Sequence, residues 1–278
     1  MKLRTPAVAG RFYPSNPEEL RKELEDYAAS VRLPSEEPVS RKLLGGVVPH
    51  AGYFFSGSHA MHFMMWLKAS GQLFDTFVIV NPNHTGYGAA ISLDDFEAWQ
   101  TPFGKVEVDT ELREALPFKK APEAHSFEHS GEVMLPMLQF VCENSFRILP
   151  VTLTRQDHHH ASLLAGGITE AAGRLNRRIC WIASSDFSHY LPPETGYHFD
   201  QMVIDRILSY DINGVEETVR ENDISVCGFG PIMSLMAYSQ QVAGKPEIKI
   251  LSRGHSGEKM ESDQVVDYVS MVCLGDRI

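Results

Sequence analysis

The sequence has no long apolar run and no closely spaced cysteine pair. Its longest hydrophobic stretches are far shorter than the roughly 20 residues that span a bilayer. The N-terminal segment MKLRTPAVAGRFYP lacks the apolar core of a signal peptide. The 4 cysteines are widely separated with no CxxC spacing, so neither a zinc ribbon nor a disulfide framework is indicated. We therefore expect a cytoplasmic protein with free thiols and no membrane association.

Positive charge is also scarce. Lys and Arg number 25 against 36 Asp and Glu, which gives a net charge of −11 and argues against nucleic acid or an anionic membrane as a partner. Hydrophobic residues make up 43% of the 278 residues, enough for a substantial core. No repeat, low-complexity tract or linker divides the chain, so we predict a single domain over residues 1–278.

The order of apolar and amphipathic segments predicts an α/β fold. A strand over 43–48, a helix over 58–70 and a strand over 74–80 form a β-α-β unit, and an amphipathic helix over 17–30 precedes it. Residues 90–108 are typical of short antiparallel strands. Pro231 is expected at the first position of a later helix. The pattern predicts a mostly parallel sheet with helices on its faces.

Polar side chains follow three of the predicted strands. His50 comes after the strand over 43–48, His84 after that over 74–80, and Asp186 and His189 after that over 178–183. In open α/β sheets, ligands bind at the carboxyl ends of the strands. A single histidine at such a place is usually satisfied by ordinary hydrogen bonds, whereas several strand ends together favour a composed site for metal binding or proton transfer.

Cys227 is a candidate third ligand. It lies in ISVCGFGP, just before a predicted helix whose N-terminus would favour the thiolate, and Gly228 and Gly230 allow close backbone approach. The alternative is that Cys227 is a small buried hydrophobe, which is the interpretation we favour for the other three cysteines.

Two further segments are rich in titratable residues. The segment AHSFEHSGEVMLP supplies His125, Glu128, His129 and Glu132; the last two are three residues apart near a predicted helix start and would face one cleft. The alternative is a capping arrangement that uses Ser130 or Glu132. In RQDHHHASLL, adjacent helical histidines point about 100° apart and do not converge on one ion, whereas Asp157 is expected to cap the helix.

Nine blocks of the sequence, in this order, resemble the Memo family, which is the protein B component of the AmmeMemoRadiSam system. They are AVAGRFYP, PHAGYFFSG, NPNHTGYG, TPFGKVEVD, EHSGEVMLPMLQ, ILPVTL, SSDFSHY, CGFGP and DQVVDYVS. The resemblance implies a single three-layer α/β/α domain around a mostly parallel mixed sheet, similar to class III (LigB-like) extradiol dioxygenases. Those enzymes hold Fe(II) with two histidines and a carboxylate and leave positions open for substrate and O₂.

The resemblance also implies roles for particular residues. His50 and His84 match the two histidine ligands, and Cys227 stands where the dioxygenases have glutamate. The positions that match the remaining catalytic machinery are His189 as the catalytic base, Asp186 in the same site, and His129 and Glu132 in the block beside the cleft.

The resulting hypothesis is a metal-dependent redox enzyme with a mononuclear centre. Fe(II) is the expected metal, and Cu or Zn also suits a site with a thiolate. The substrate is an unknown small molecule or peptide, and the resemblance implies AMMECR1-like and radical-SAM proteins as partners. The alternative is a non-catalytic module that binds a peptide or a metal in the same cleft. A zinc hydrolase with Asp186 or Glu132 as base is a third hypothesis.

Overall fold

The computed structural model describes residues 1–33 and 37–277, and within them twelve strands join one mixed sheet. The strands are β1 (Leu3–Arg4), β2 (Arg41–Val48), β3 (Thr76–Pro82), β4 (Ile91–Leu93), β5 (Ala98–Thr101), β6 (Gly104–Val108), β7 (Lys119–Lys120), β8 (Arg147–Leu153), β9 (Ile179–Ser184), β10 (His189–Leu191), β11 (Glu247–His255) and β12 (Val265–Arg277). Their main order is β1-β5-β6-β8-β3-β9-β2-β12-β10; β11 pairs with β12, and β4 pairs with β7 and β8.

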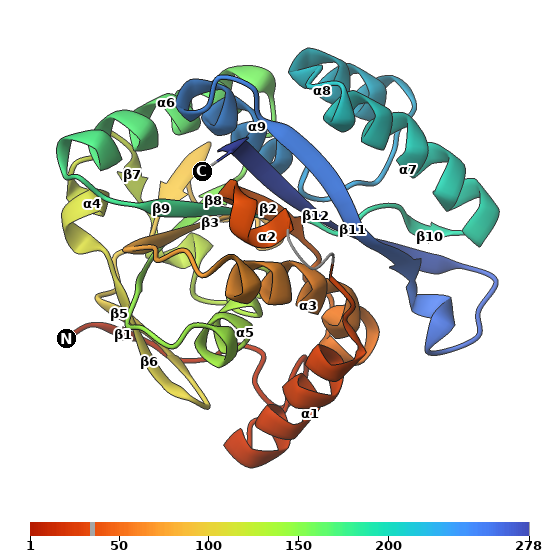
Figure 1. Ribbon diagram of the computed structural model, residues 1–278, viewed down its shortest axis with the longest axis horizontal. Coiled ribbons are helices and arrows are strands. Elements are labelled where there is room, and N and C mark those ends of the chain that lie inside the picture. Colours follow the sequence, from red (N-terminus) through yellow and green to blue (C-terminus); the bar gives the residue numbers. More distant parts are fainter. Residues whose placement is uncertain (34–36, 278) are drawn as a thin grey trace.

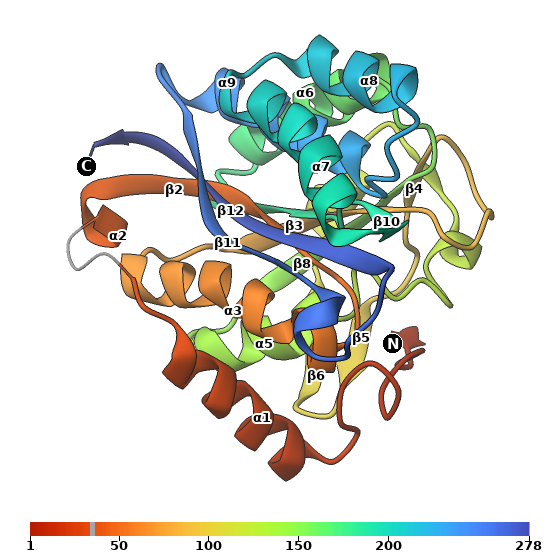
Figure 2. The ribbon, with the colours of Figure 1, turned by 90° about the vertical axis from the view of Figure 1, so that its right-hand side faces the viewer.

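The helices cover both faces of this sheet and make three layers (Figures 1 and 2). On one face lie α1 (Pro17–Ser30), α3 (Tyr53–Ser70) and α5 (Met134–Val141). On the other lie α6 (His158–Arg174), α7 (Pro193–Leu208), α8 (Ile212–Glu221) and α9 (Phe229–Val242). The short helices are α2 (Glu37–Ser40), α4 (Thr110–Glu114), η1 (Pro122–Ala124) and η2 (Ser256–Glu258). The predicted α/β/α architecture is confirmed. Among the described residues, no helix combines the length and apolar composition needed to cross a membrane.

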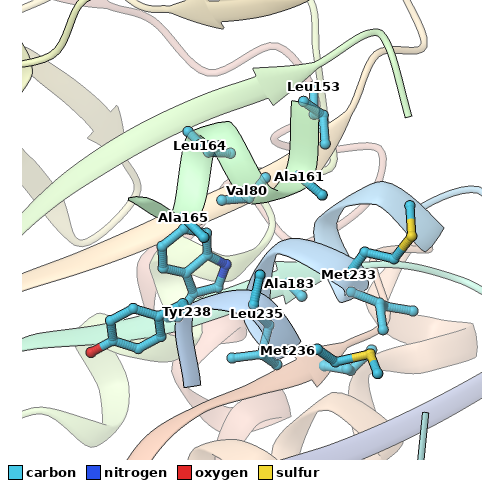
Figure 3. Packing of buried hydrophobic residues seen from close by; sticks show 14 of the residues in the cluster. Val80, Leu153, Ala161, Leu164, Ala165, Ala183, Met233, Leu235, Met236 and Tyr238 are labelled. Atoms are coloured by element: carbon cyan, nitrogen blue, oxygen red, sulfur yellow. The ribbon is translucent and has the colours of Figure 1, made fainter. Parts of the chain in front are cut away.

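The central strands carry apolar residues on both faces because each face has its own core. Along β3, Phe77 and Ile79 belong to the core beneath α3 and α5, whereas Val78 and Val80 belong to the core beneath α6 and α9. Figure 3 shows the second core, where Val80 of β3 lies among side chains of α6 and α9. Alternation of side chains across a strand buried on both sides explains the uninterrupted apolar runs.

The parallel centre of the sheet aligns three strand ends at one edge. The strands β3, β9 and β2 are neighbours and parallel, with Val80 opposite Ala183 and Val48 opposite Ser184. The residues that follow these strands therefore leave the sheet side by side. The pairing of β2 with β12 is antiparallel, as is that of β5 with β6, which lie in the segment 90–108 where short antiparallel strands are predicted.

Two helix starts differ from the expectation. The helix α3 begins at Tyr53, five residues before Ser58, with Gly57 inside it. Gly57 is a packing residue rather than a breaker, because an added Cβ would lie 2.6 Å from the Tyr27 ring. The helix α9 begins at Phe229, so Pro231 is its third residue rather than its first. The backbone N–H groups in the first turn of a helix have no acceptor within the helix, so proline, which lacks an N–H, is tolerated there.

Candidate metal centre

His50, His84 and Cys227 converge at the carboxyl edge of the sheet. His50 follows β2, His84 follows β3, and Cys227 directly precedes Gly228, the N-cap of α9. One potential ligand atom from each lies within 4.8 Å of the other two. The His50 Nε2 and Cys227 Sγ atoms are 3.2 Å apart, and the two imidazole centroids are 5.2 Å apart. Three donors from separate segments thus meet at one point.

The hydrogen bonds of His50 make Nε2 the unprotonated ring nitrogen, and this atom faces the Cys227 sulfur. The Ser184 hydroxyl donates to the carbonyl of Ser130 (2.8 Å), so its oxygen accepts the hydrogen bond from His50 Nδ1 (2.7 Å). Nδ1 therefore carries the proton, and the Nε2 lone pair faces Cys227. Burial, together with His84 and His129, lowers the pKa of His50 well below its usual value, so the ring is neutral at pH 7.

His84 is oriented by a buried carboxylate that the sequence analysis did not assign to the site. Glu128 accepts hydrogen bonds from the backbone N (2.7 Å) and Nδ1 (2.9 Å) of His84, and from both N and Oγ of Ser130. Burial alone would raise the pKa of Glu128, but the hydrogen bonds and charge of His84 bring it down to about 2. A carboxylate that accepts the hydrogen bond from Nδ1 of a histidine leaves Nε2 as the atom that can bind a metal, and it makes that nitrogen more basic.

His129 is a partly exposed imidazole next to His50 and His84. Its ring centroid is 4.7 Å from that of His84 and 5.5 Å from that of His50, and its Nδ1 lies 3.6 Å from Glu128 Oε1. The atoms of His84, Glu128 and His129 form a second group with the mutual spacing of metal ligands. Burial lowers the pKa of His129 to about 4 despite the nearby Glu128 carboxylate, so this ring is also neutral at pH 7.

Cys227 is held tightly between the ends of β9 and α9. Its Sγ accepts a hydrogen bond from Asp186 N (3.2 Å), and a Cβ on Gly228 would lie 2.3 Å from the carbonyl oxygen of Ser184. The close approach expected for Gly228 is therefore real. Burial and the Asp186 charge raise the pKa of the Cys227 thiol well above its usual value, and they outweigh any help from the helix N-terminus. All four cysteines are free thiols.

Asp186 and His189 lie beside this group. Asp186 Oδ1 accepts from His50 N (2.8 Å), and its Oδ2 is 3.8 Å from His50 Nε2. Burial raises the pKa of Asp186 to about 6, against the lowering effects of the His50 N–H and the charges of His189 and His84. His189 is partly exposed, and its Nδ1 donates to the carbonyl of Ser225 (2.9 Å), which leaves Nε2 as the ring nitrogen available for proton transfer.

Glu132 makes its contacts in a different part of the structure from the one expected. It is fully buried, pairs with Arg4 (2.7 Å), and accepts from Ala7 N, Val8 N and the Tyr13 hydroxyl. These contacts attach the N-terminal segment and do not support a catalytic role. The capping alternative is wrong, because α5 starts at Met134 with no side-chain cap. Asp157 does cap α6, as predicted, by accepting from His160 N.

The donor atoms, rather than cavity size, identify this site. Cavities of about 270 and 510 Å³ lie at the opposite edge of the sheet, where Leu73 and Phe74 line both. That edge has no cluster of convergent histidine, cysteine and carboxylate atoms among the residues the structure describes. Fold and site together define an α/β protein with two imidazoles and a thiol at the carboxyl edge of its sheet.

Comparison with known proteins places this chain in a family. The family model described as Memo-like protein matches residues 4–272. The chain is 37% identical over 274 residues to a MEMO1 family protein of Methanosarcina barkeri and 41% identical over 273 residues to one of Archaeoglobus fulgidus. Each alignment covers 97% of this chain and 99% of the relative. The chain belongs to the Memo-like family.

One solved structure is also similar in shape. An uncharacterized protein of Escherichia coli K12 aligns with a TM-score of 0.49 and 14% identity, over 81% of this chain and 99% of that one. The likeness is too distant to bear on the site.

Proposed function

We propose that His50, His84 and Cys227 hold a single metal ion, Fe(II), in a redox enzyme. The observation that carries the proposal is the convergence of their donor atoms within 4.8 Å of one another. The surroundings fit a cation: both histidines bind protein oxygens through Nδ1, which leaves Nε2 of each as the ligand atom, and the N–H of Asp186 points at the sulfur. Three protein ligands are the number that leaves a catalytic metal with open positions.

The choice of iron rests on the resemblance to class III extradiol dioxygenases, and the thiolate makes Cu and Zn the competing metals. Fe(II) would supply one-electron and O₂ chemistry to a substrate at the open positions. The chain would supply proton transfer. His189 would exchange a proton through Nε2, and Asp186, with a pKa of about 6, lies next to His50 where it would orient a ligand.

Metal content tests the proposal directly. After anaerobic purification from cells supplied with iron, copper and zinc, the native protein should contain close to one metal ion per chain, predominantly iron. His50→Ala and His84→Ala should lose it while remaining folded. His159→Ala, in the histidine run on α6, is the matched control and should keep it. A native protein that stays empty after reconstitution would refute the metal centre.

The Glu128 carboxylate gives a finer prediction. Glu128→Gln keeps the shape of the side chain but removes the charge behind His84, and metal affinity should fall about 10- to 100-fold. Competition with a chelator measures the change. Glu123→Gln, an exposed neighbour in η1, should leave the affinity unaltered. Equal affinities in both variants would mean that Glu128 serves the fold alone.

One observation favours the binding module as second candidate. Three aromatic residues that lie within three positions of His84, Glu128 or His189 in the sequence are more than half exposed: Tyr87, Phe127 and Tyr190. Such residues suit contact with an aromatic group or a peptide. If this is the function, Cys227→Ala should lose its metal and still bind the peptide with unchanged affinity, whereas a metal-dependent enzyme would lose turnover.

A further inference from the structure

Two buried carboxyl groups outside the metal centre face each other. Asp200, on α7, is fully buried, and Asp267, on β12, is 5% exposed. The Oδ2 atom of each is buried and receives no hydrogen bond from another group in the described part of the chain. The two carboxyls are within hydrogen-bonding reach of each other. Two carboxylates close enough to hydrogen-bond to each other do not both stay ionised in a protein interior without water.

Together these residues hold the segment that carries Asp186 and His189. Asp200 Oδ1 accepts hydrogen bonds from Ser188 N (3.0 Å) and Ser188 Oγ (2.6 Å). The backbone of Asp267 donates to Ser188 O (2.9 Å) and accepts from Phe187 N (2.8 Å). The segment is therefore fixed from α7 by a side chain and from β12 by main chain, and the two attachments meet at the carboxyl pair.

We propose that Asp200 and Asp267 share one proton, and that this proton keeps the segment from Asp186 to His189 in place. With the proton present, Oδ2 of one residue donates to Oδ2 of the other, and Asp200 Oδ1 stays free to accept from Ser188. Without it, the two carboxylates repel each other. The side chain of Asp267 already packs against α7 at Gly196, where an added Cβ would lie 2.3 Å from its Oδ2.

The charged and titratable groups around the two carboxyls are compatible with one bound proton. The charge of Arg253 on β11 lowers the pKa of both carboxyls, although its guanidinium donates to Gln201 Oε1 and to the carbonyl of Tyr197. His255 lies opposite Asp267 in the β11–β12 register; its backbone N–H donates to Glu258 of η2, and its ring Nδ1 is buried without a hydrogen-bond partner among the described residues. Tyr268 adds a neutral phenol from β12. Burial and the facing carboxylate raise the pKa of Asp267 to about 8, so the proton would leave as pH rises through that value.

Amide hydrogen exchange of the full-length protein between pH 6.5 and 9.5 tests the inference. After correction for base catalysis, protection of the Ser188 and His189 amides should fall by up to about tenfold per pH unit above the pKa of the pair. In Asp267→Asn the amide group donates to Asp200 without titrating, so protection should not change with pH. Asp263→Asn, exposed and just before β12, should behave as the native protein does.

Two results would overturn the inference: constant protection in the native protein up to pH 9.5, or the same decline in Asp267→Asn. If that variant does not fold, the carboxyl ¹³C shifts of the native protein decide the question. One carboxyl of the pair should titrate near pH 8, and titration of both below pH 5 would refute a shared proton. None of these measurements involves a metal, so they succeed or fail independently of the proposed function.

Discussion

Metal binding should release one proton from the protein, and the Cys227 thiol should be its source. Burial and the Asp186 charge keep the pKa of this thiol well above its usual value, so it is protonated at pH 7 when no cation is bound. A metal binds the thiolate, not the thiol. The lowered pKa values of His50 and His129 mean that these rings are already neutral and contribute no proton.

The sign of the pH dependence follows from this. Below the thiol pKa, a proton competes with the metal for the Cys227 sulfur. Each unit rise in pH should therefore raise the apparent affinity for the metal about tenfold. Titration with Zn²⁺ between pH 7 and 8.5, with a competing chelator, measures the slope. Cys227→Ala should bind more weakly and show almost no slope. A native protein whose affinity does not change over this range would exclude the thiolate as a ligand.

Replacing Glu132 with glutamine should cause the largest loss of stability. The change leaves Arg4, which is 1% exposed, as a buried charge without its carboxylate. It also weakens the bonds from Ala7 N, Val8 N and the Tyr13 hydroxyl. Removal of one partner of a buried ion pair costs about 3–5 kcal/mol, and we expect a loss of that size in the free energy of unfolding.

Urea unfolding followed by circular dichroism measures this loss. Glu170→Gln, which breaks an exposed pair with Arg174 on α6, is the control and should have little effect. A loss below about 1 kcal/mol for Glu132→Gln would mean that Arg4 is stabilised well enough by Trp99 and its two carbonyl partners.

The residues that follow the strands show how much of the site the local sequence pattern could predict. The apolar runs before His50, His84 and Asp186 mark buried strands, and parallel strands in an α/β sheet end at a common edge. Which strands are neighbours does not follow from these runs. The adjacency of β3, β9 and β2 depends on pairing between residues more than 100 positions apart, such as Trp181 with Val78 and with Gly45.

The segment around His129 shows where local pattern was misleading. Spacing placed His129 and Glu132 on one helical face, but both precede α5 and their contacts differ. His129 joins the rings of His84 and His50, whereas Glu132 pairs with Arg4, 128 residues earlier. Glu128, adjacent to His129 in sequence, serves His84 instead. A carboxylate's role depends on which cation or donor reaches it, and distant parts of the chain supply those partners.

The sequence by itself determined the α/β class, the main helices and strands, and the three residues that form the donor group. Those features depend on periodicity, on residue type and on a resemblance spread along the whole chain. Only the tertiary structure decided which carboxylate supports the histidines, that Glu132 attaches the N-terminus, and that Asp200 faces Asp267. These are contacts between buried polar groups, whose free energy depends on desolvation and on partners far away in sequence.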